Sequence, residues 1–592
     1  MSLKEFLKHT LATVAGIIVA SVIMGIIGIV AIIGMIASEE TTTKVKDNSV
    51  FVLNLSGTLE ERAKQDVFAQ FTGNVSENLG LDDILYAINE AKDNKDIKGI
   101  YIEAGAFISD SPASSQAIRN SLADFKKSGK WIVAYGETYT QTTYYICSVA
   151  DKVLLNPQGM VDWHGMAAQP MFLKDLLAKF GVKFQLAKVG KYKSAPEMMT
   201  ADKMSDPNRE QVTAYINAIW DVMLTDVAAS RKLSKDTLNA YADRYMAFAD
   251  PQDYVKTKLV DKLLYNDEVK KEINAMLKIK DDKKINSLSM SQMLNLPDNG
   301  KKKGDEIAIY YAYGDIVTTN TGGVTGKACI ASEDVCRDLD KLAKDDDVKA
   351  VVLRINSGGG SAYASEQIWH SVMNIKAKKP VVVSMGGMAA SGGYYISCPA
   401  NYIYAEPTTL TGSIGIFGMF PDISGLLTEK LGVKFDEVKT NKHSALGTMA
   451  RPFNAEEMSI LEAYVDRGYS LFRKRVADGR KMKVEAVEEI AQGRVWIGRD
   501  ALKNKLVDGM GGLDKAVAKA AELAKLKEHH TADYPAQPDW MEQLMAKTGS
   551  RSYIDEQLRE TLGEYYAPFS FVKNISNQDA IQARLPYHII LK

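Results

Sequence analysis

The sequence is short of the residues that mark several protein classes. It has four cysteines and seven histidines in 592 residues, and no two cysteines form a C-x-x-C pair. A disulfide framework and a Cys/His zinc site are therefore excluded as the basis of the fold, although a single Cys329–Cys336 bridge stays open. An excess of one charge is also missing, since 73 Lys and Arg stand against 74 Asp and Glu. Without a basic field over the chain, nucleic acid is not an expected partner.

Charged residues are absent from residues 11–36, and no other run of this kind is as long. As a helix this segment would be about 39 Å long, enough to cross a hydrocarbon core of about 30 Å. A cleaved signal peptide is the alternative, but Met35 stands where such a peptide has a small residue. Lysines precede the run, and Glu39 and Glu40 follow it. We therefore expect a cytoplasmic tail at 1–10, a membrane anchor at 11–36 and the remainder outside the cytoplasm.

The rest of the chain contains one sequence unit twice. Two long segments of the first half each resemble a segment about 250 residues later, and the short runs GVKF and KLVD recur at similar spacing. Such ordered self-similarity indicates a duplicated domain. The expected organisation is a first repeat at 46–276, a polar linker at 277–304, a second repeat at 305–534 and a C-terminal extension at 535–592.

Apolar strands alternate with helices inside each copy. In the second copy the pattern predicts strands at 307–311, 350–355 and 381–385, helices at 332–344 and near 362–375, and a short helix starting near Ser391. Continuous apolar strands separated by helices are typical of a parallel sheet covered on both faces. Each copy is therefore predicted to be an α/β domain.

Two glycine clusters of the second copy stand where a parallel sheet places its active site. One follows the strand at 350–355 and contains Gly359, and the other follows the strand at 381–385 and contains Ser391 and Gly392. Glycines let backbone N–H groups approach a substrate, and a serine at a helix start is a candidate nucleophile. Tight turns are the structural alternative for each cluster. In the first copy Gln141 takes the place of Ser391, so that copy cannot perform the same nucleophilic chemistry alone.

Three segments resemble one known family. SMGGMAASGGYYIS (384–397) resembles the nucleophile segment of signal peptide peptidase A, in its long, two-repeat, membrane-anchored bacterial form. VGKYKSA (189–195) resembles the segment that carries the family's catalytic lysine, which maps onto Lys193, and GRVWIGRDA (493–501) resembles a further stretch. One departure is Gly358, where the related pattern has proline. The resemblance covers most of the chain and implies a tandem repeat of the fold shared by Clp protease and the crotonases.

The resemblance also implies a function and a site. It implies a serine endopeptidase with Ser391 as nucleophile and Lys193 as general base, for which Gly359 and Gly392 are the candidate oxyanion donors. It further implies cleaved signal peptides as substrates, no metal or organic cofactor, a homotetramer, and a place on the periplasmic side of a bacterial inner membrane. In the repeat alignment Lys193 matches His443. Each copy thus keeps half of a dyad, and the site is expected where two copies meet, within one chain or between chains.

Two other functions stay open at this stage. A crotonase-like acyl-CoA hydratase or hydrolase would use the same oxyanion chemistry, but it needs a carboxylate acid or base and a cytoplasmic location. A membrane scaffold with two degenerate copies would leave Ser391, Gly359 and Lys193 without a role.

Overall fold

The computed structural model describes residues 42–63, 78–297, 303–320, 328–537 and 581–584, with nine single positions between 9 and 24. The tail expected at 1–10, the anchor expected at 11–36 and most of the extension expected at 535–592 therefore lie outside the described stretches. Within the part of the chain that is described, no helix has the length and apolar character needed to cross a membrane.

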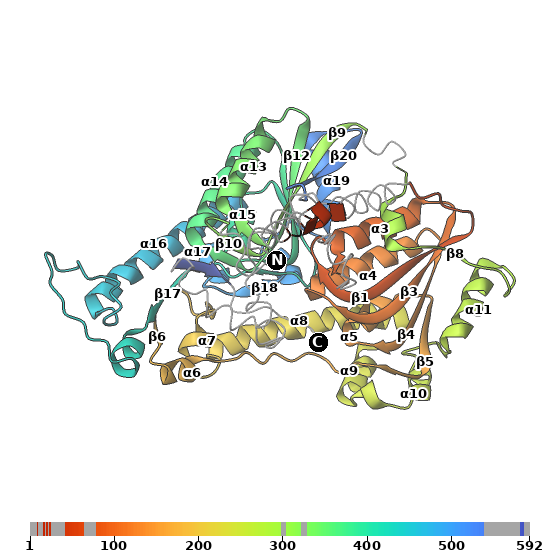
Figure 1. The fold of residues 1–592 in the computed structure, drawn as a ribbon, viewed down its shortest axis with the longest axis horizontal. Coiled ribbons are helices and arrows are strands. Elements are labelled where there is room, and N and C mark those ends of the chain that lie inside the picture. Colours follow the sequence, from red (N-terminus) through yellow and green to blue (C-terminus); the bar gives the residue numbers. More distant parts are fainter. Residues whose placement is uncertain are drawn as a thin grey trace.

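A parallel sheet forms the centre of the first repeat (Figure 1). Its strands are β1 (Ser49–Glu60), β2 (Asn78–Gly80), β3 (Ile97–Ile108), β4 (Trp131–Tyr139), β5 (Lys152–Val161), β7 (Lys262–Leu263) and β8 (Asn286–Leu288). They follow the order β2-β1-β3-β4-β5-β7, with β8 beside β1, and every pair is parallel. Its main helices are α3 (Leu81–Asp93), α4 (Pro112–Lys126), α5 (Gln141–Cys147), α8 (Asp206–Arg231) and α11 (Asn266–Leu277).

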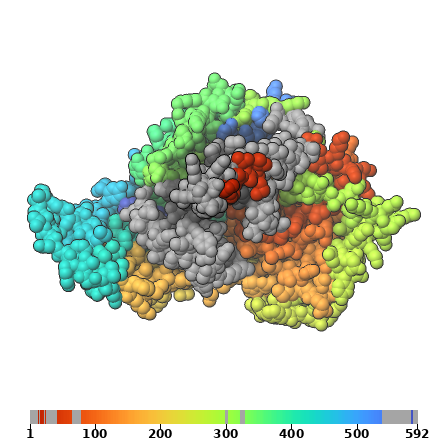
Figure 2. All heavy atoms as spheres, viewed as in Figure 1, coloured from red at the N-terminus to blue at the C-terminus, as the bar shows by residue number. Residues whose placement is uncertain are grey.

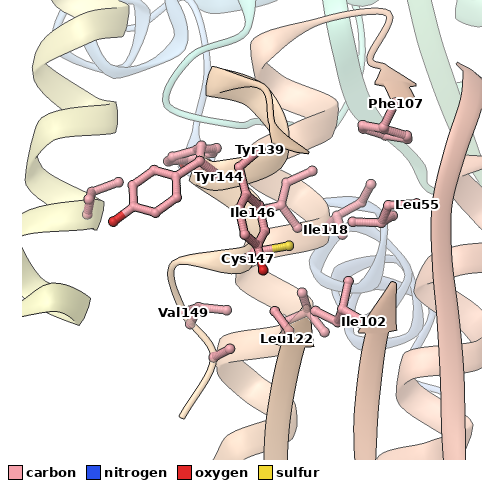
Figure 3. Close-up of a cluster of buried hydrophobic side chains, with 14 of the residues drawn as sticks. Leu55, Ile102, Phe107, Ile118, Leu122, Tyr139, Tyr144, Ile146, Cys147 and Val149 are labelled. Carbon is pink, nitrogen blue, oxygen red and sulfur yellow. The ribbon is translucent and has the colours of Figure 1, made fainter. Parts of the chain in front are cut away.

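The two faces of this sheet pack into separate apolar clusters. Ile100 and Ile102 of β3 point into the larger cluster with α3, α4, α5 and α8, whereas Tyr101 between them points toward α11. Figure 3 shows part of the larger cluster, where side chains such as Leu122 and Tyr144 meet between helices and strands. Each such apolar side chain stabilises the fold by about 1.5–3 kcal/mol on burial.

Four short helices complete the first repeat. They are α9 (Lys235–Asp243), η1 (Met246–Phe248), α10 (Pro251–Lys256) and α12 (Met290–Leu294).

The second repeat is built in the same way around a second sheet. Its strands are β9 (Asp305–Tyr313), β12 (Val348–Ser357), β14 (Val381–Ala390), β15 (Tyr402–Ala405), β16 (Leu410–Gly412), β18 (Val495–Ile497), β19 (Gly509–Met510) and β20 (His529–Tyr534). Its helices are α13 (Ser332–Lys344), α14 (Ala362–Lys376), α15 (Gly392–Ser397), α16 (Ala455–Arg480), α17 (Val484–Ile490), α18 (Gly498–Lys503) and α19 (Leu513–Ala524). The order is β18-β16-β14-β12-β9-β20, and only β16 and β18 pair antiparallel among these described strands.

The tandem α/β architecture predicted from the sequence is confirmed. Helices α3, α4, α8 and α11 each have a counterpart about 250 residues later, namely α13, α14, α16 and α19. One predicted boundary was wrong. The strand at 381–385 continues to Ala390, because Met388–Ala390 pair with β16, so Gly386 and Gly387 lie inside β14 and not in a loop after it.

The polar stretch expected as a linker at 277–304 is partly built into the first repeat. Its strand β8 pairs with β1, and Leu288 and Met293 are buried in the larger apolar cluster. Further apolar side chains of the segment pack against the same cluster or against the one on the other face of the sheet, namely Ile279, Ile285, Met290 and Leu296, so the segment is docked on the first repeat.

A third sheet joins the two repeats. It contains β6 (Lys183–Lys188) from the first repeat, β10 (Asp315–Val317), β11 (Cys329–Ala331), β13 (Gly359–Ser361) and β17 (Phe417–Asp422) from the second, and β21 (Ile581–Arg584) from the C-terminal extension. The order is β11-β10-β13-β21-β17-β6, and β6 pairs with β17 in an antiparallel register over its full length. The short helices α6 (Lys174–Lys179) and α7 (Glu197–Thr200) flank β6 in sequence. The segment just after β6, which carries Lys193, is thereby held against the second repeat.

One segment projects from the end of the molecule beyond this third sheet. Residues 423–454, between β17 and α16, form much of the cyan lobe in Figure 2 and include η2 (Leu426–Lys430). Several of its apolar side chains are strongly exposed, with Leu431 at 64%, Val438 at 98% and Met449 at 60%.

Buried polar contacts fix the two repeats against each other. Glu61 of the first repeat forms an ion pair with Arg354 of β12, and both side chains are almost fully buried. Asn356 Nδ2 donates to Glu61 Oε2 at 2.9 Å, while Asn356 Oδ1 accepts from the N–H of Met388 at 3.1 Å. Removing one partner of such a buried pair costs about 3–5 kcal/mol, so these contacts hold the ends of β12 and β14 in place.

Candidate active site

Ser391 occupies a strained turn between strand β14 and helix α15. Its φ of +54° and ψ of −113° lie in a region that residues other than glycine rarely adopt. The turn is held by backbone hydrogen bonds, since Ser391 N–H donates to Gly412 O at 2.8 Å and Tyr395 N–H donates to Ser391 O at 2.8 Å. The side chain is fully buried. The surrounding structure therefore fixes where the hydroxyl points.

Lys193 comes from the first repeat and meets Ser391 directly. Its Nζ lies 2.6 Å from Ser391 Oγ, 3.0 Å from Ser413 Oγ and 3.1 Å from Ser413 O. The side chain is only 1% exposed, and burial lowers the pKa of the Lys193 amine well below its usual value. Among the described residues its polar neighbours are hydroxyls and a carbonyl, and none of these contacts is with a carboxylate that would hold a proton on the amine. The arrangement thus favours a neutral amine that can accept a proton.

The stem of Lys193 lies between glycines of the second repeat. A Cβ placed on Gly493, whose φ is +78°, would lie 2.6 Å from the Cβ and from the backbone N of Lys193. One placed on Gly415 would lie 3.3 Å from Lys193 Cδ. Larger residues at these two positions would displace the lysine, which gives a physical reason for the glycine that opens the GRVWIGRDA stretch.

Ser413 is a site residue that the sequence interpretation missed. It lies just after β16 with a φ of +48°, and its N–H donates to Arg494 O at 2.7 Å. A signal was available in the repeat alignment, because the position 250 residues earlier holds Trp163 and has no hydroxyl. The second copy therefore differs from the first at the residue that contacts Lys193 Nζ as well as at Ser391.

The two predicted oxyanion glycines lie side by side, but their N–H groups differ. A Cβ placed on Gly359, whose φ is +102°, would lie 2.7 Å from Gly392 N. Gly392 is the first residue of α15, so its N–H has no acceptor within the helix. The N–H of Gly359 donates to Ser357 Oγ at 3.1 Å, and Ser357 Oγ donates to Gly314 O at 2.6 Å. Gly392 is thus the donor presented in this structure, and Gly359 is engaged elsewhere.

Each site residue has an aligned position in the other repeat, and that position holds a different residue. Gln141, at the place of Ser391 in the first repeat, accepts from the N–H groups of His164 and Gly165 through Oε1 and donates to Gly165 O. It closes a loop and offers no nucleophile. His443, the alignment partner of Lys193, lies on the projecting segment with its Nε2 3.6 Å from Glu456 Oε1. The structure therefore brings together Ser391, Lys193, Gly359 and Gly392, and places His443 apart from them.

The cysteines and the candidate metal-ligating side chains bear on whether the protein has the geometry of a disulfide or of a metal site. All four cysteines are free, so Cys329 and Cys336 are not bridged. Among the residues that the structure describes, no cluster of three or more His, Cys, Asp or Glu side chains is arranged to hold a metal ion.

Comparison with known proteins shows that the chain is similar to proteases. Residues 124–280 and 374–527, one segment from each repeat, match peptidase family S49, and residues 325–409 match Clp protease. The chain is 38% identical over 557 residues to Protease 4 of Salmonella typhi, covering 90% of this chain and 88% of that protein. Protease 4 of Haemophilus influenzae is 32% identical over 88% of this chain and 87% of its own length. The chloroplastic serine protease SPPA of Arabidopsis thaliana is 29% identical over 82% of this chain and 70% of its own length.

Proposed function

Because this chain belongs to peptidase family S49 and is a serine protease of that family, we propose that Ser391 is its nucleophile and Lys193 its general base. The observation that carries the proposal is the 2.6 Å contact between Lys193 Nζ and Ser391 Oγ in a fully buried setting. Each repeat supplies one of the two groups, and both belong to the same chain. The first repeat retains the base and the second retains the nucleophile, which explains why neither copy is complete alone.

The geometry supports a simple acyl-transfer sequence. Neutral Lys193 takes the proton of Ser391 Oγ as the oxygen attacks the carbonyl carbon of a peptide bond. The negative charge that develops on the carbonyl oxygen is stabilised by the N–H of Gly392. Lys193 then returns the proton to the leaving amine, and a water molecule releases the acyl group from Ser391 with Lys193 again acting as base. Ser413 holds Nζ through two contacts, so that the amine stays aimed at Ser391.

We infer that the substrates are released signal peptides and similar apolar peptides, met at a membrane surface. Support comes from the uncharged run at 11–36, which has the length of a membrane span, and from the acidic residues after it. In this proposal the protein is a single-pass protein of a bacterial inner membrane, with both repeats on the periplasmic side. Cell fractionation tests the anchor: the full chain should sediment with membranes, and a variant lacking residues 1–40 should not.

We also infer self-association, with a homotetramer as the expected assembly. The supporting observation is the exposed apolar surface of the projecting segment, which includes Leu431, Val438 and Met449. Exposed apolar side chains gathered on one segment are typical of a protein–protein contact. Light scattering of the detergent-extracted protein tests this, and a mass equal to one chain would contradict it.

The main rival is a crotonase-like enzyme acting on acyl-CoA thioesters. That chemistry calls for a carboxylate near the acyl group, whereas Ser391 Oγ faces an amine and the amine faces a second serine. We therefore expect the purified protein to hydrolyse a fluorogenic peptide with an apolar sequence and to leave acyl-CoA thioesters intact. Thioester hydrolysis or hydration at rates that match or exceed those on peptides would reverse the assignment.

A further inference from the structure

Gln211 of helix α8 is a buried glutamine that contacts both chain neighbours of Lys193. Its Nε2 donates to Tyr192 O at 2.9 Å and to Ser194 Oγ at 3.0 Å. Its Oε1 accepts from the N–H of Val495 in β18 at 3.2 Å. The side chain is only 2% exposed, and α8, the long yellow helix in Figure 1, packs against β18. One amide group thus joins the lysine segment of the first repeat to a strand of the second.

The amide of Gln211 fits in one orientation only. A backbone carbonyl such as that of Tyr192 can only accept a hydrogen bond, and a backbone N–H such as that of Val495 can only donate one. Turning the amide over would therefore place oxygen against oxygen at Tyr192 and donor against donor at Val495. Nε2 also lies 3.3 Å from Asn208 Oδ1. A buried polar group satisfied in this way makes its surroundings rigid.

The chain leading into β18 connects this amide to the groups that hold the amine of Lys193. Gln492 O accepts from the N–H of Tyr192 at 3.0 Å, and Arg494 O accepts from the N–H of Ser413 at 2.7 Å. Ser413 in turn contacts Lys193 Nζ through its hydroxyl and its carbonyl group. The glutamine therefore fastens together the segment that carries the base and the segment that aims it.

Comparison of the two repeats separates this glutamine from the fold that they share. Helices α8 and α16 both have 26 residues, and each position of α8 corresponds to one 249 residues later. The counterpart of Gln211 is Ile460, whose side chain is 46% exposed. In the repeat alignment His443 takes the place of Lys193. The repeat with the lysine thus has a buried amide at this position, and the repeat without it has an exposed apolar residue.

We propose that Gln211 is a positioning residue of the active site, which fixes the backbone at Lys193 so that Nζ reaches Ser391 Oγ. The proposal rests on the proposed function, since it takes Lys193 as the base. The N–H of Lys193 makes a long bond, 3.4 Å to Gly190 O, so the place of this backbone depends on the contacts of its neighbours. The amine itself contacts Ser391 and Ser413, and Gln211 acts on it through the chain. A shift of Nζ by about 1 Å would lower the rate by about 10²-fold.

Gln211→Met tests the proposal, because it keeps the length of the side chain and removes both hydrogen-bonding ends. We expect kcat for a fluorogenic peptide to fall by about 10²-fold while KM stays within about twofold of the normal value. The midpoint of the rise of kcat/KM with pH should move upward, because a displaced amine regains water and the pKa of Lys193 returns toward its usual value.

Gln116→Met is the matched control. Gln116 is equally buried between the repeats, where its Oε1 accepts from the N–H of Thr408 at 3.3 Å and from the Thr408 hydroxyl at 2.9 Å. The same substitution therefore removes contacts between the repeats at a position that does not hold the lysine segment. This variant should lose stability but keep the normal kcat and the normal pH midpoint.

A double-mutant cycle asks whether Gln211 acts through Lys193. The Lys193→Met protein has no base to position, so adding Gln211→Met should change its kcat/KM by less than about threefold. A further loss of about 10²-fold in this background would overturn the proposal. So would an unchanged kcat and midpoint in Gln211→Met, an equal loss of kcat in Gln116→Met, or loss of the native circular dichroism spectrum in Gln211→Met. Failure of the proposed function would instead appear as full activity of the Lys193→Met protein.

Discussion

Replacing Ser391 by alanine is expected to lower kcat/KM for peptide hydrolysis by about 10⁴- to 10⁶-fold, because the variant has no nucleophile. The fold should survive, since the hydroxyl is a small group and the backbone bonds of Ser391 to Gly412 and Tyr395 do not involve it. Steady-state kinetics with a fluorogenic peptide, together with a thermal unfolding curve, measure both effects.

Ser397→Ala is the matched control for this variant. Ser397 lies on the same helix, is equally buried and donates its hydroxyl hydrogen to Gly393 O at 2.6 Å. Its loss should lower stability by about 1 kcal/mol and leave kcat/KM within a few-fold of the normal value. Measurable activity of the Ser391→Ala protein at the level of this control would remove Ser391 from the mechanism.

Replacing Lys193 is the second change that should lower kcat/KM strongly. Lys193→Met keeps the length and apolar stem but has no base, and kcat/KM should fall by about 10²- to 10⁴-fold. Lys193→Arg should be no better, because a guanidinium stays protonated and cannot accept the proton of Ser391.

In the normal protein kcat/KM should rise with pH, because the neutral fraction of the Lys193 amine grows. The midpoint of this rise should lie well below the usual lysine pKa of 10.5.

Burial of the Lys193 amine also predicts how the stability of the protein depends on pH. Because the pKa of Lys193 is lower in the folded than in the unfolded protein, the unfolded state binds more protons between the two values, and stability rises with pH there. Lys193→Met removes this cost, so its unfolding temperature should exceed that of the normal protein most at low pH and least above pH 10.5.

His443→Ala is the control for a mechanism in which a histidine is the base. This variant should keep its activity, and a folded but inactive His443→Ala protein would refute the assignment of Lys193 as the base.

Much of the fold follows from local sequence patterns. Helix α13 has the predicted bounds of 332–344, because its apolar residues recur at helical spacing and acidic residues begin its first turn. The duplication was visible because both copies kept the same strand and helix spacing. The end of β14 was mispredicted, since glycines usually end a strand, while here they admit Asn356 and Ser111 close to the backbone.

The site itself was only partly accessible to sequence reasoning. Ser391 stood out as a serine between small residues at a strand end, but Lys193 is one of many lysines and was assigned through the family resemblance. Its burial depends on glycines about 220 and 300 residues away in the sequence. Ser413 and β21 depend in the same way on pairing between distant segments, which no local pattern encodes. The four residues of β21 form a strand because the edges of β13 and β17 are available to them.

The most direct test of the composite site is the rate at which a fluorophosphonate labels Ser391 as a function of pH. The modified residue is identified by mass spectrometry of the digested protein. The account predicts labelling at Ser391 with a rate that rises through one pKa well below 10.5. Labelling of the Lys193→Met protein should be slower by about 10²-fold or more between pH 5 and pH 10. Labelling of a different serine, or labelling of Ser391 at the normal rate in the Lys193→Met protein, would contradict it.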